Sequence, residues 1–112
     1  MHKKYACMII KKAREIFESC KSLVDISRED EEEITVCGDI HGQYYDLLNI
    51  FSTNGIPSKS NPYLFNGDFI DRGSFSVEVI MTLLSWKVLY PGHFFMSRGN
   101  HETAQLNKLY GF

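Results

Sequence analysis

Apolar residues near the start of the chain recur at the spacing of an amphipathic helix. Lysine, arginine and glutamate fill the positions between them. Residues three or four positions apart share one face of a helix. The pattern therefore predicts a helix over residues 6–24. Its apolar face would carry Ile9, Ala13, Ile16, Phe17, Cys20, Leu23 and Val24.

Three short apolar runs farther along the chain are typical of buried strands. They are residues 34–37 (ITVC), 63–66 (YLFN) and 93–97 (HFFMS). The first is rich in β-branched residues and is followed by Gly38, as expected of a short strand that ends in a turn. We therefore predict three buried strands.

Two further helical patterns separate these strands. Residues 43–51 place their large apolar side chains on one face, and the turn-rich stretch 54–62 ends that helix. The second helix would have Ser74 as its N-cap and Glu78 in its first turn, and would stop before Pro91. Alternating strands and helices predict an α/β fold, in which right-handed crossovers join parallel strands.

Composition limits the remaining possibilities. A chain of 112 residues with 44% hydrophobic residues can bury one core, so we expect a single domain. A net charge of −2 without a basic stripe argues against nucleic-acid binding. The charged run REDEEE (residues 28–33) is interpreted as a solvated connector.

The chain carries no pattern typical of a membrane protein or a secreted protein. The apolar run near the start ends at Ile10, which is too short for a signal-peptide core, and no run is long enough to span a bilayer. Cys7, Cys20 and Cys37 are odd in number and lack CxxC spacing, so we expect reduced thiols that serve packing. The predicted location is the cytoplasm, the nucleus or both.

Polar clusters follow each of the three predicted strands. They are GDIHG (38–42), GDFIDRG (67–73) and RGNHET (98–103). Parallel strands bring their carboxyl ends to one edge of a sheet, where open α/β sheets bind ligands. Three clusters that are distant in sequence should therefore form one site.

The residue types in these clusters favour a metal site. Asp39, His41, Asp68 and Asn100 offer oxygen and imidazole donors without a thiolate, which suits Mn, Fe, Zn or Mg. Carboxylates gathered at one point repel one another unless a cation neutralises them. One aspartate can bridge two metals about 3.5–4 Å apart, an arrangement that activates water for attack on phosphorus. Asp68, central among the clusters, is the natural bridge.

Three further residues suggest phosphate chemistry. Arg72 offers a planar, permanently charged fork for phosphate oxygens. His101 could protonate a leaving alkoxide if a carboxylate orients its imidazole, and Asp71 is the candidate for that carboxylate. Taken alone, Asp71 and Arg72 could be an ion pair, His41 a structural histidine and Asn100 a turn residue. Their joint occurrence at three strand ends favours the functional interpretation.

The clusters also resemble the signature blocks of a known family. GDIHG, GDFIDRG and RGNHE are similar to the blocks GDxHG, GDxxDRG and GNHE of the metal-dependent phosphoprotein phosphatases, which act on phosphoserine and phosphothreonine. The resemblance covers residues 34–112, and GDFIDRGSFSVEVI and YDLLNIF are most similar to the type-5 branch. It implies the βαβαβ half of a calcineurin-like metallophosphatase fold, with residues 1–27 as an N-terminal helix region.

The resemblance implies a role for each site residue. Two divalent ions, manganese being the first choice and Fe, Zn or Mg the alternatives, would be the cofactors. By the resemblance, the first ion would be held by Asp39, His41 and Asp68, and the second by Asp68 and Asn100. His101 would donate a proton and be oriented by Asp71, while Arg72 and Asn100 would bind phosphate.

The chain departs from the family pattern at its end. The family domain runs farther and supplies two more histidine ligands and a second phosphate-binding arginine, so the second metal site is expected to be incomplete in residues 1–112. The type-5 branch also implies a tetratricopeptide domain, for which this chain has no pattern. The main hypothesis is therefore a serine/threonine phosphatase that acts on phosphoproteins. The alternative is an inactive fragment that binds a metal, or that binds a protein or self-associates through an exposed apolar face. Hydrolysis of a small phosphoester or dinucleotide is a third possibility.

Overall fold

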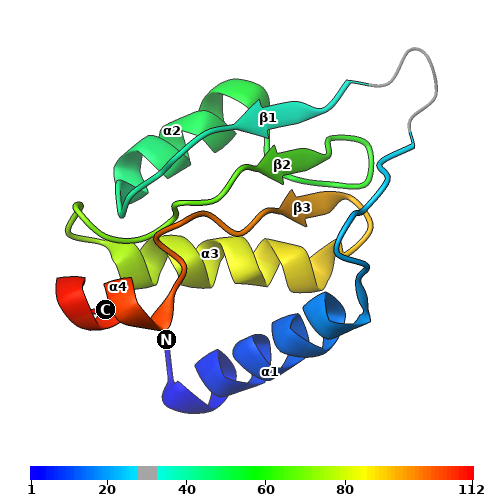
Figure 1. Cartoon of the computed structure of the whole chain (residues 1–112). Coiled ribbons are helices and arrows are strands. Elements are labelled where there is room, and N and C mark those ends of the chain that lie inside the picture. Colours follow the sequence, from blue (N-terminus) through cyan, green and yellow to red (C-terminus); the bar gives the residue numbers. More distant parts are fainter. Residues whose placement is uncertain (28–32) are drawn as a thin grey trace.

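The computed structural model describes residues 1–27 and 33–112. Except for Glu33, the charged run interpreted as a connector lies outside these residues. The elements follow the order α1, β1, α2, β2, α3, β3 and α4, which matches the predicted order with one additional helix at the end (Figure 1). Within the described part of the chain, no helix is both long enough and apolar enough to cross a membrane.

Three short parallel strands form the sheet. They are β1 (Thr35–Cys37), β2 (Tyr63–Phe65) and β3 (Phe94–Met96), hydrogen-bonded in the order β1-β2-β3. The crossovers α2 (Tyr44–Asn54) and α3 (Ser76–Leu89) contact each other, and the three arrows of Figure 1 point the same way. The predicted α/β class is therefore confirmed, and the ends of all three strands lie at one edge.

The core lies between the sheet and these two helices. Neighbouring residues of a strand point to opposite faces, so alternate residues enter the core. The fully buried strand residues are Tyr63, Phe65 and Phe94, and their rings lie within 6.4 Å of one another, centroid to centroid. Complete burial of one such side chain stabilises the fold by about 1.5–3 kcal/mol. On the opposite face, Val36 is 63% exposed, so part of that face is apolar and open.

Helix α1 (Lys3–Ser19) packs against α3 and differs from its predicted range at both ends. It starts early because His2 caps it: the His2 Nδ1 accepts a hydrogen bond from the Lys4 N–H at 3.2 Å. It ends early because Cys20 is extended, and its N–H donates to the Phe17 carbonyl at 3.1 Å. The predicted end at residue 24 was therefore wrong.

The start of α3 also differs from the prediction. Its N-cap is Phe75, and the predicted cap, Ser74, is exposed one residue earlier. The next residue, Ser76, accepts a hydrogen bond at its Oγ from the Asp71 N–H at 3.0 Å, which ties the helix start to the preceding loop. Glu78 lies in the first turn, as predicted.

The far end of α3 carries a buried amine that the sequence patterns did not indicate. The Lys87 Nζ donates to the carbonyl oxygens of Pro91 and Phe94, at 2.9 and 2.8 Å. It also lies 5.7 Å from the ring centre of Phe17 and 5.4 Å from that of Phe95. Burial lowers the pKa of Lys87 below its ordinary value.

The additional helix, α4 (Ala104–Tyr110), was not predicted. Its N-cap is Thr103, whose Oγ1 accepts from the Leu106 N–H at 3.3 Å, and Gly111 ends it in the left-handed conformation. Both are ordinary capping signals. The helix was missed because its seven residues are too few to establish a period.

Candidate metal centre and active site

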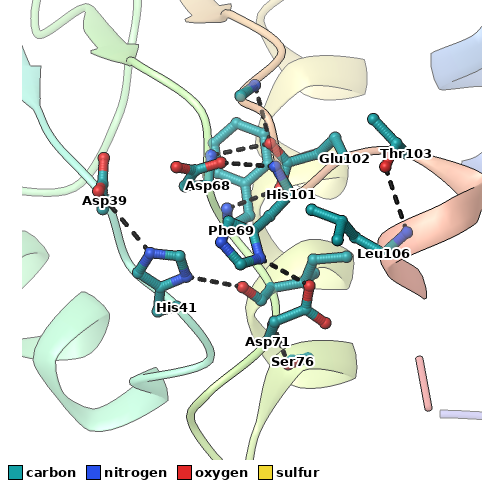
Figure 2. Close-up of polar contacts among 12 residues, drawn as sticks. Asp39, His41, Asp68, Phe69, Asp71, Ser76, His101, Glu102, Thr103 and Leu106 are labelled. Atoms are coloured by element: carbon teal, nitrogen blue, oxygen red, sulfur yellow. Dashed lines mark hydrogen bonds and ion pairs between the residues drawn. The ribbon is translucent and has the colours of Figure 1, made fainter. Parts of the chain in front are cut away.

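Three loops meet at the edge where the strands end. We call them loop 1 (residues 38–43), loop 2 (residues 66–75) and loop 3 (residues 97–103). Loops 1 and 2 are joined through the main chain, because the Asp68 carbonyl accepts from the N–H groups of Ile40 and His41, each at 3.0 Å. The side chains that face this junction come from all three loops (Figure 2).

Loop 3 is joined to loop 2 by the side chain of Glu102. Its Oε2 accepts from the N–H groups of Asp68 and Gly99, and its Oε1 accepts from the Phe69 N–H, each at 2.8 Å. In return, the Asp68 Oδ1 accepts from the His101 N–H at 2.9 Å. The three loops therefore form one hydrogen-bonded unit behind the site.

Imidazole and carboxylate donors gather in front of this unit. His41, Asp68 and His101 each offer a ligand atom, and these atoms lie within 4.8 Å of one another. The His41 Nδ1 lies 2.9 Å from the Ile70 carbonyl, to which it donates, so its Nε2 is free to bind an ion. The Asp39 Oδ2 borders the group, 3.7 Å from the His41 Nε2. This donor set fits a divalent ion such as Mn, Fe or Zn.

A buried pair lies beside these donors. The His101 Nδ1 is 2.9 Å from the Asp71 Oδ2, and both side chains are at most 5% exposed. An ionised Asp71 only accepts, so Nδ1 carries the proton and the Nε2 of His101 faces the site. The ring centres of His41 and His101 are 4.8 Å apart, so both imidazoles border the same part of the site.

The backbone is strained at the site. Among the described residues, those other than glycine with positive φ are His41, Asp68, Asp71 and Arg72, at 45°, 52°, 69° and 67°. Each of them was predicted as a site residue. The left-handed conformation costs an L residue about 1–2 kcal/mol, and such strain concentrates at functional sites.

Close approach between the loops explains one of the glycine positions in the clusters. A Cβ on Gly73 would collide with the His41 carbonyl oxygen. That carbonyl accepts from the Gly73 N–H at 2.9 Å, so loops 1 and 2 touch here through main-chain atoms alone. A larger residue would therefore separate the two loops.

Arg72 and Asn100 are the predicted site residues on the outer side. Both are exposed. Arg72 lines a cleft of about 780 Å³, whose lining also includes Tyr110 of α4. The Tyr110 ring centre is 5.4 Å from that of His101, so the missed helix α4 forms part of the border of the site.

Glu102 is the site residue whose role sequence reasoning missed. It belongs to the third cluster, where its residue type alone indicates no function. A carboxylate directly after the pair Asn100 and His101 was a signal that could have been used. Its backbone partners could not be predicted, because Asp68 is 34 positions away in the chain.

Comparison with known proteins identifies the family. The family model described as calcineurin-like phosphoesterase matches residues 33–112. The chain belongs to this family. The calcineurin-like fold is confirmed by a solved protein serine/threonine phosphatase from Saccharomyces cerevisiae, with a TM-score of 0.95 and 46% sequence identity. That similarity covers 100% of this chain and 36% of the yeast chain.

Curated members of the calcineurin-like phosphoesterase family are similar over most or all of the chain. Identity to serine/threonine-protein phosphatase 5 of Homo sapiens is 57% over 112 residues, which is 100% of this chain and 22% of the human protein. Identity to serine/threonine-protein phosphatase T of Trypanosoma brucei brucei is 61% over 104 residues, which is 93% of this chain and 22% of that protein. The chain thus spans about a fifth of the length of these relatives, and the resemblance seen in its motifs is confirmed.

Proposed function

We propose that the chain is the metal-binding part of a protein serine/threonine phosphatase, which hydrolyses phosphoserine and phosphothreonine esters in proteins. The buried pair of Asp71 and His101, adjacent to the donors His41 and Asp68, is the observation that supports this most directly. The similarity to proteins named serine/threonine phosphatases supports the substrate class.

The donor atoms would divide between two ion positions. Asp39, His41 and Asp68 would hold one divalent ion, with manganese as the first candidate, and Asp68 and Asn100 would reach a second. When bound, the ions would supply Lewis-acid activation of water and of the phosphate oxygens. The Asp68 carboxylate would contribute to both positions, and its Oδ1 already accepts from the His101 N–H, which fixes the direction of the carboxylate.

The remaining residues would act on the phosphate ester. With its ring protonated at both nitrogens, His101 would give the Nε2 proton to the leaving serine or threonine oxygen and keep the Nδ1 proton that it donates to Asp71, so that the alcohol departs neutral. Asp71 would keep that nitrogen directed at the ester by occupying Nδ1. Arg72 would bind two phosphate oxygens with its planar guanidinium, and the Asn100 amide would donate to another.

Phosphate release tests this proposal. The 112-residue chain with Mn²⁺ should release inorganic phosphate from a phosphothreonine peptide. His101→Asn should lower the rate by about 10²–10⁴-fold, the usual contribution of a positioned acid or base. Asp68→Asn should also lower the rate, because it removes the carboxylate that would hold the ions. His93→Asn is the matched control, because His93 precedes β3 and lies at the opposite edge of the sheet. No release above buffer by folded, Mn²⁺-loaded chain would contradict the proposal for this stretch on its own.

A non-catalytic binding module is the second candidate. Two observations favour it. Asp68 and Asn100 alone are too few ligands for a tight second metal site. Val36 is also exposed on the open face of the sheet. One weak Mn²⁺ site in calorimetry, combined with concentration-dependent association in sedimentation, would support this candidate. Two tight sites on a monomer would exclude it. Turnover of a dinucleotide without turnover of the phosphopeptide would instead indicate a small-molecule phosphoesterase.

A further inference from the structure

Glu102 lies behind the predicted metal ligands and binds three main-chain N–H groups (Figure 2). All three hydrogen bonds are 2.8 Å long, two to Oε2 and one to Oε1. Hydrogen bonds to an ionised acceptor are roughly twice as strong as those between neutral groups. With both oxygens occupied by the main chain, Glu102 is directed toward the loops and away from an ion or a substrate.

These bonds hold Asp68 in a conformation that it would rarely adopt alone. Its φ is 52°, in the left-handed region. The Asp68 N–H donates to Glu102, its carbonyl accepts from Ile40 and His41, and its Oδ1 accepts from the His101 N–H. Every main-chain polar group of Asp68 is therefore bound, and the direction of its carboxylate is set by its neighbours.

The contact between loops 2 and 3 depends on the same carboxylate. A Cβ on Gly99 would collide with the N and Oδ1 atoms of Asp68, so the two loops touch at this point. The N–H groups of Asp68 and Gly99 both point at one Glu102 oxygen. Without a negative acceptor between them, these two half-buried donors would face each other without a partner, which is unfavourable.

We propose that Glu102 is a positioning residue for metal binding: it fixes the direction of the Asp68 carboxylate by holding the main chain of loops 2 and 3. This inference rests on the metal-binding part of the proposed function and is independent of ester hydrolysis. Replacing Glu102 should therefore change the affinity for the ion, whereas replacing a residue that serves only the stability of the fold should not.

Glu102→Gln is the sharpest variant because it keeps the shape of the side chain. The amide can present one acceptor oxygen, and its NH₂ group then faces at least one main-chain donor. Glu18→Gln is the matched control, because Glu18 is an exposed carboxylate on α1 and the change in net charge is the same. Mn²⁺ affinity is measured by calorimetry on the 112-residue chain, and thermal unfolding is followed in EDTA by circular dichroism.

Glu102→Gln should weaken Mn²⁺ binding by about 10–100-fold, the range typical of partners that orient metal ligands. Glu18→Gln should leave the affinity unchanged. A lower unfolding temperature of Glu102→Gln with unchanged Mn²⁺ affinity would overturn the inference, as would a wild-type chain that binds no Mn²⁺. A wild-type chain that binds Mn²⁺ but releases no phosphate would contradict the proposed catalysis while leaving this comparison intact.

A second measurement needs no variant and therefore stands even if Glu102→Gln fails to fold. Hydrogen exchange of the wild-type chain is compared with and without Mn²⁺. Since the amides of Asp68, Phe69 and Gly99 all donate to Glu102, binding of an ion at Asp68 should slow their exchange further. Exchange at these amides that does not respond to saturating Mn²⁺ would show that Glu102 and the ion are not coupled.

Discussion

Two hydrogen-bonded side-chain pairs of this protein have similar lengths and opposite environments. The His101 Nδ1 and Asp71 Oδ2 are 2.9 Å apart, and the Arg14 Nε and Glu18 Oε1 are 2.7 Å apart. The side chains of the first pair are 5% and 1% exposed, whereas those of the second are 76% and 61% exposed. If the distance between the two atoms determined the coupling energy, the pair on α1 would be the more strongly coupled. If screening of the charges by solvent determines it, the pair at the site is the more strongly coupled.

The magnitudes favour screening. A hydrogen bond to a charged group inside a protein contributes about 1.5–3 kcal/mol net. An exposed pair four residues apart on a helix contributes about 0.3–0.5 kcal/mol, because water screens the charges and both side chains lose freedom. We therefore predict a coupling energy of about 1.5–3 kcal/mol between Asp71 and His101, and at most about 0.5 kcal/mol between Arg14 and Glu18.

Double-mutant cycles measure both couplings. One cycle uses Asp71→Asn and His101→Gln, and the other uses Arg14→Gln and Glu18→Gln. The free energy of unfolding is taken from urea titrations followed by circular dichroism, in EDTA so that no ion contributes. Asparagine suits position 71 because it tolerates a φ of 69° about as well as aspartate. Equal coupling energies in the two cycles, or a buried coupling below about 0.5 kcal/mol, would refute the reasoning from burial.

Three further predictions concern the core and two titrating groups. Leu83 is fully buried, so Leu83→Ala should lower the free energy of unfolding by about 3–5 kcal/mol in urea titrations, whereas Leu89→Ala, at an exposed position, should change it by less than about 0.5 kcal/mol. Burial raises the pKa of Cys37, so a maleimide at neutral pH should label the two exposed cysteines and spare Cys37 until urea is added, as read by mass spectrometry. Burial lowers the pKa of Lys87 in the folded chain below the ordinary 10.5 that applies to the unfolded chain. Between the folded pKa and 10.5, the unfolded chain therefore binds the proton more tightly than the folded chain does. The contribution of Lys87 to stability rises with pH across that window. Urea titrations from neutral pH to about pH 10.5 should therefore show wild type gaining stability relative to Lys87→Met, and a flat or falling difference would contradict this.

The sequence predicted elements well where many residues agree on one pattern. The three strands and two crossover helices each combine apolar spacing with a turn signal, and all five are present. The end of α1 was wrong because Leu23 and Val24 continue the apolar spacing while both are exposed. Periodicity cannot detect that Cys20 has already turned its N–H back to the Phe17 carbonyl. Helix ends are set by such local hydrogen bonds.

The location of the site was predictable, whereas the way it is held was not. The carboxyl ends of parallel strands lie at one edge of the sheet, whatever residues follow them. The presence of possible metal ligands directly after each strand was therefore enough to predict where the site lies. The contacts that orient those residues join Asp68 to Glu102 and His101 to Asp71, across 34 and 30 positions of the chain. Such contacts depend on the final approach of the loops, for which a sequence pattern carries no signal.

Backbone strain supports a functional site independently of any resemblance. Where the turn alone matters, this chain reaches positive φ with glycine, as at Gly111, where a Cβ would meet open space. At Asp68, Asp71 and Arg72 it reaches positive φ with residues that carry a Cβ, at a cost of about 1–2 kcal/mol for an ordinary residue such as arginine and less for aspartate, whose short polar side chain tolerates this conformation. Glycine would remove the strain at any of these three positions, but it would also remove a carboxylate or a guanidinium. Since total stability is only about 5–15 kcal/mol, side chains retained at such a cost are better explained by their chemistry than by folding.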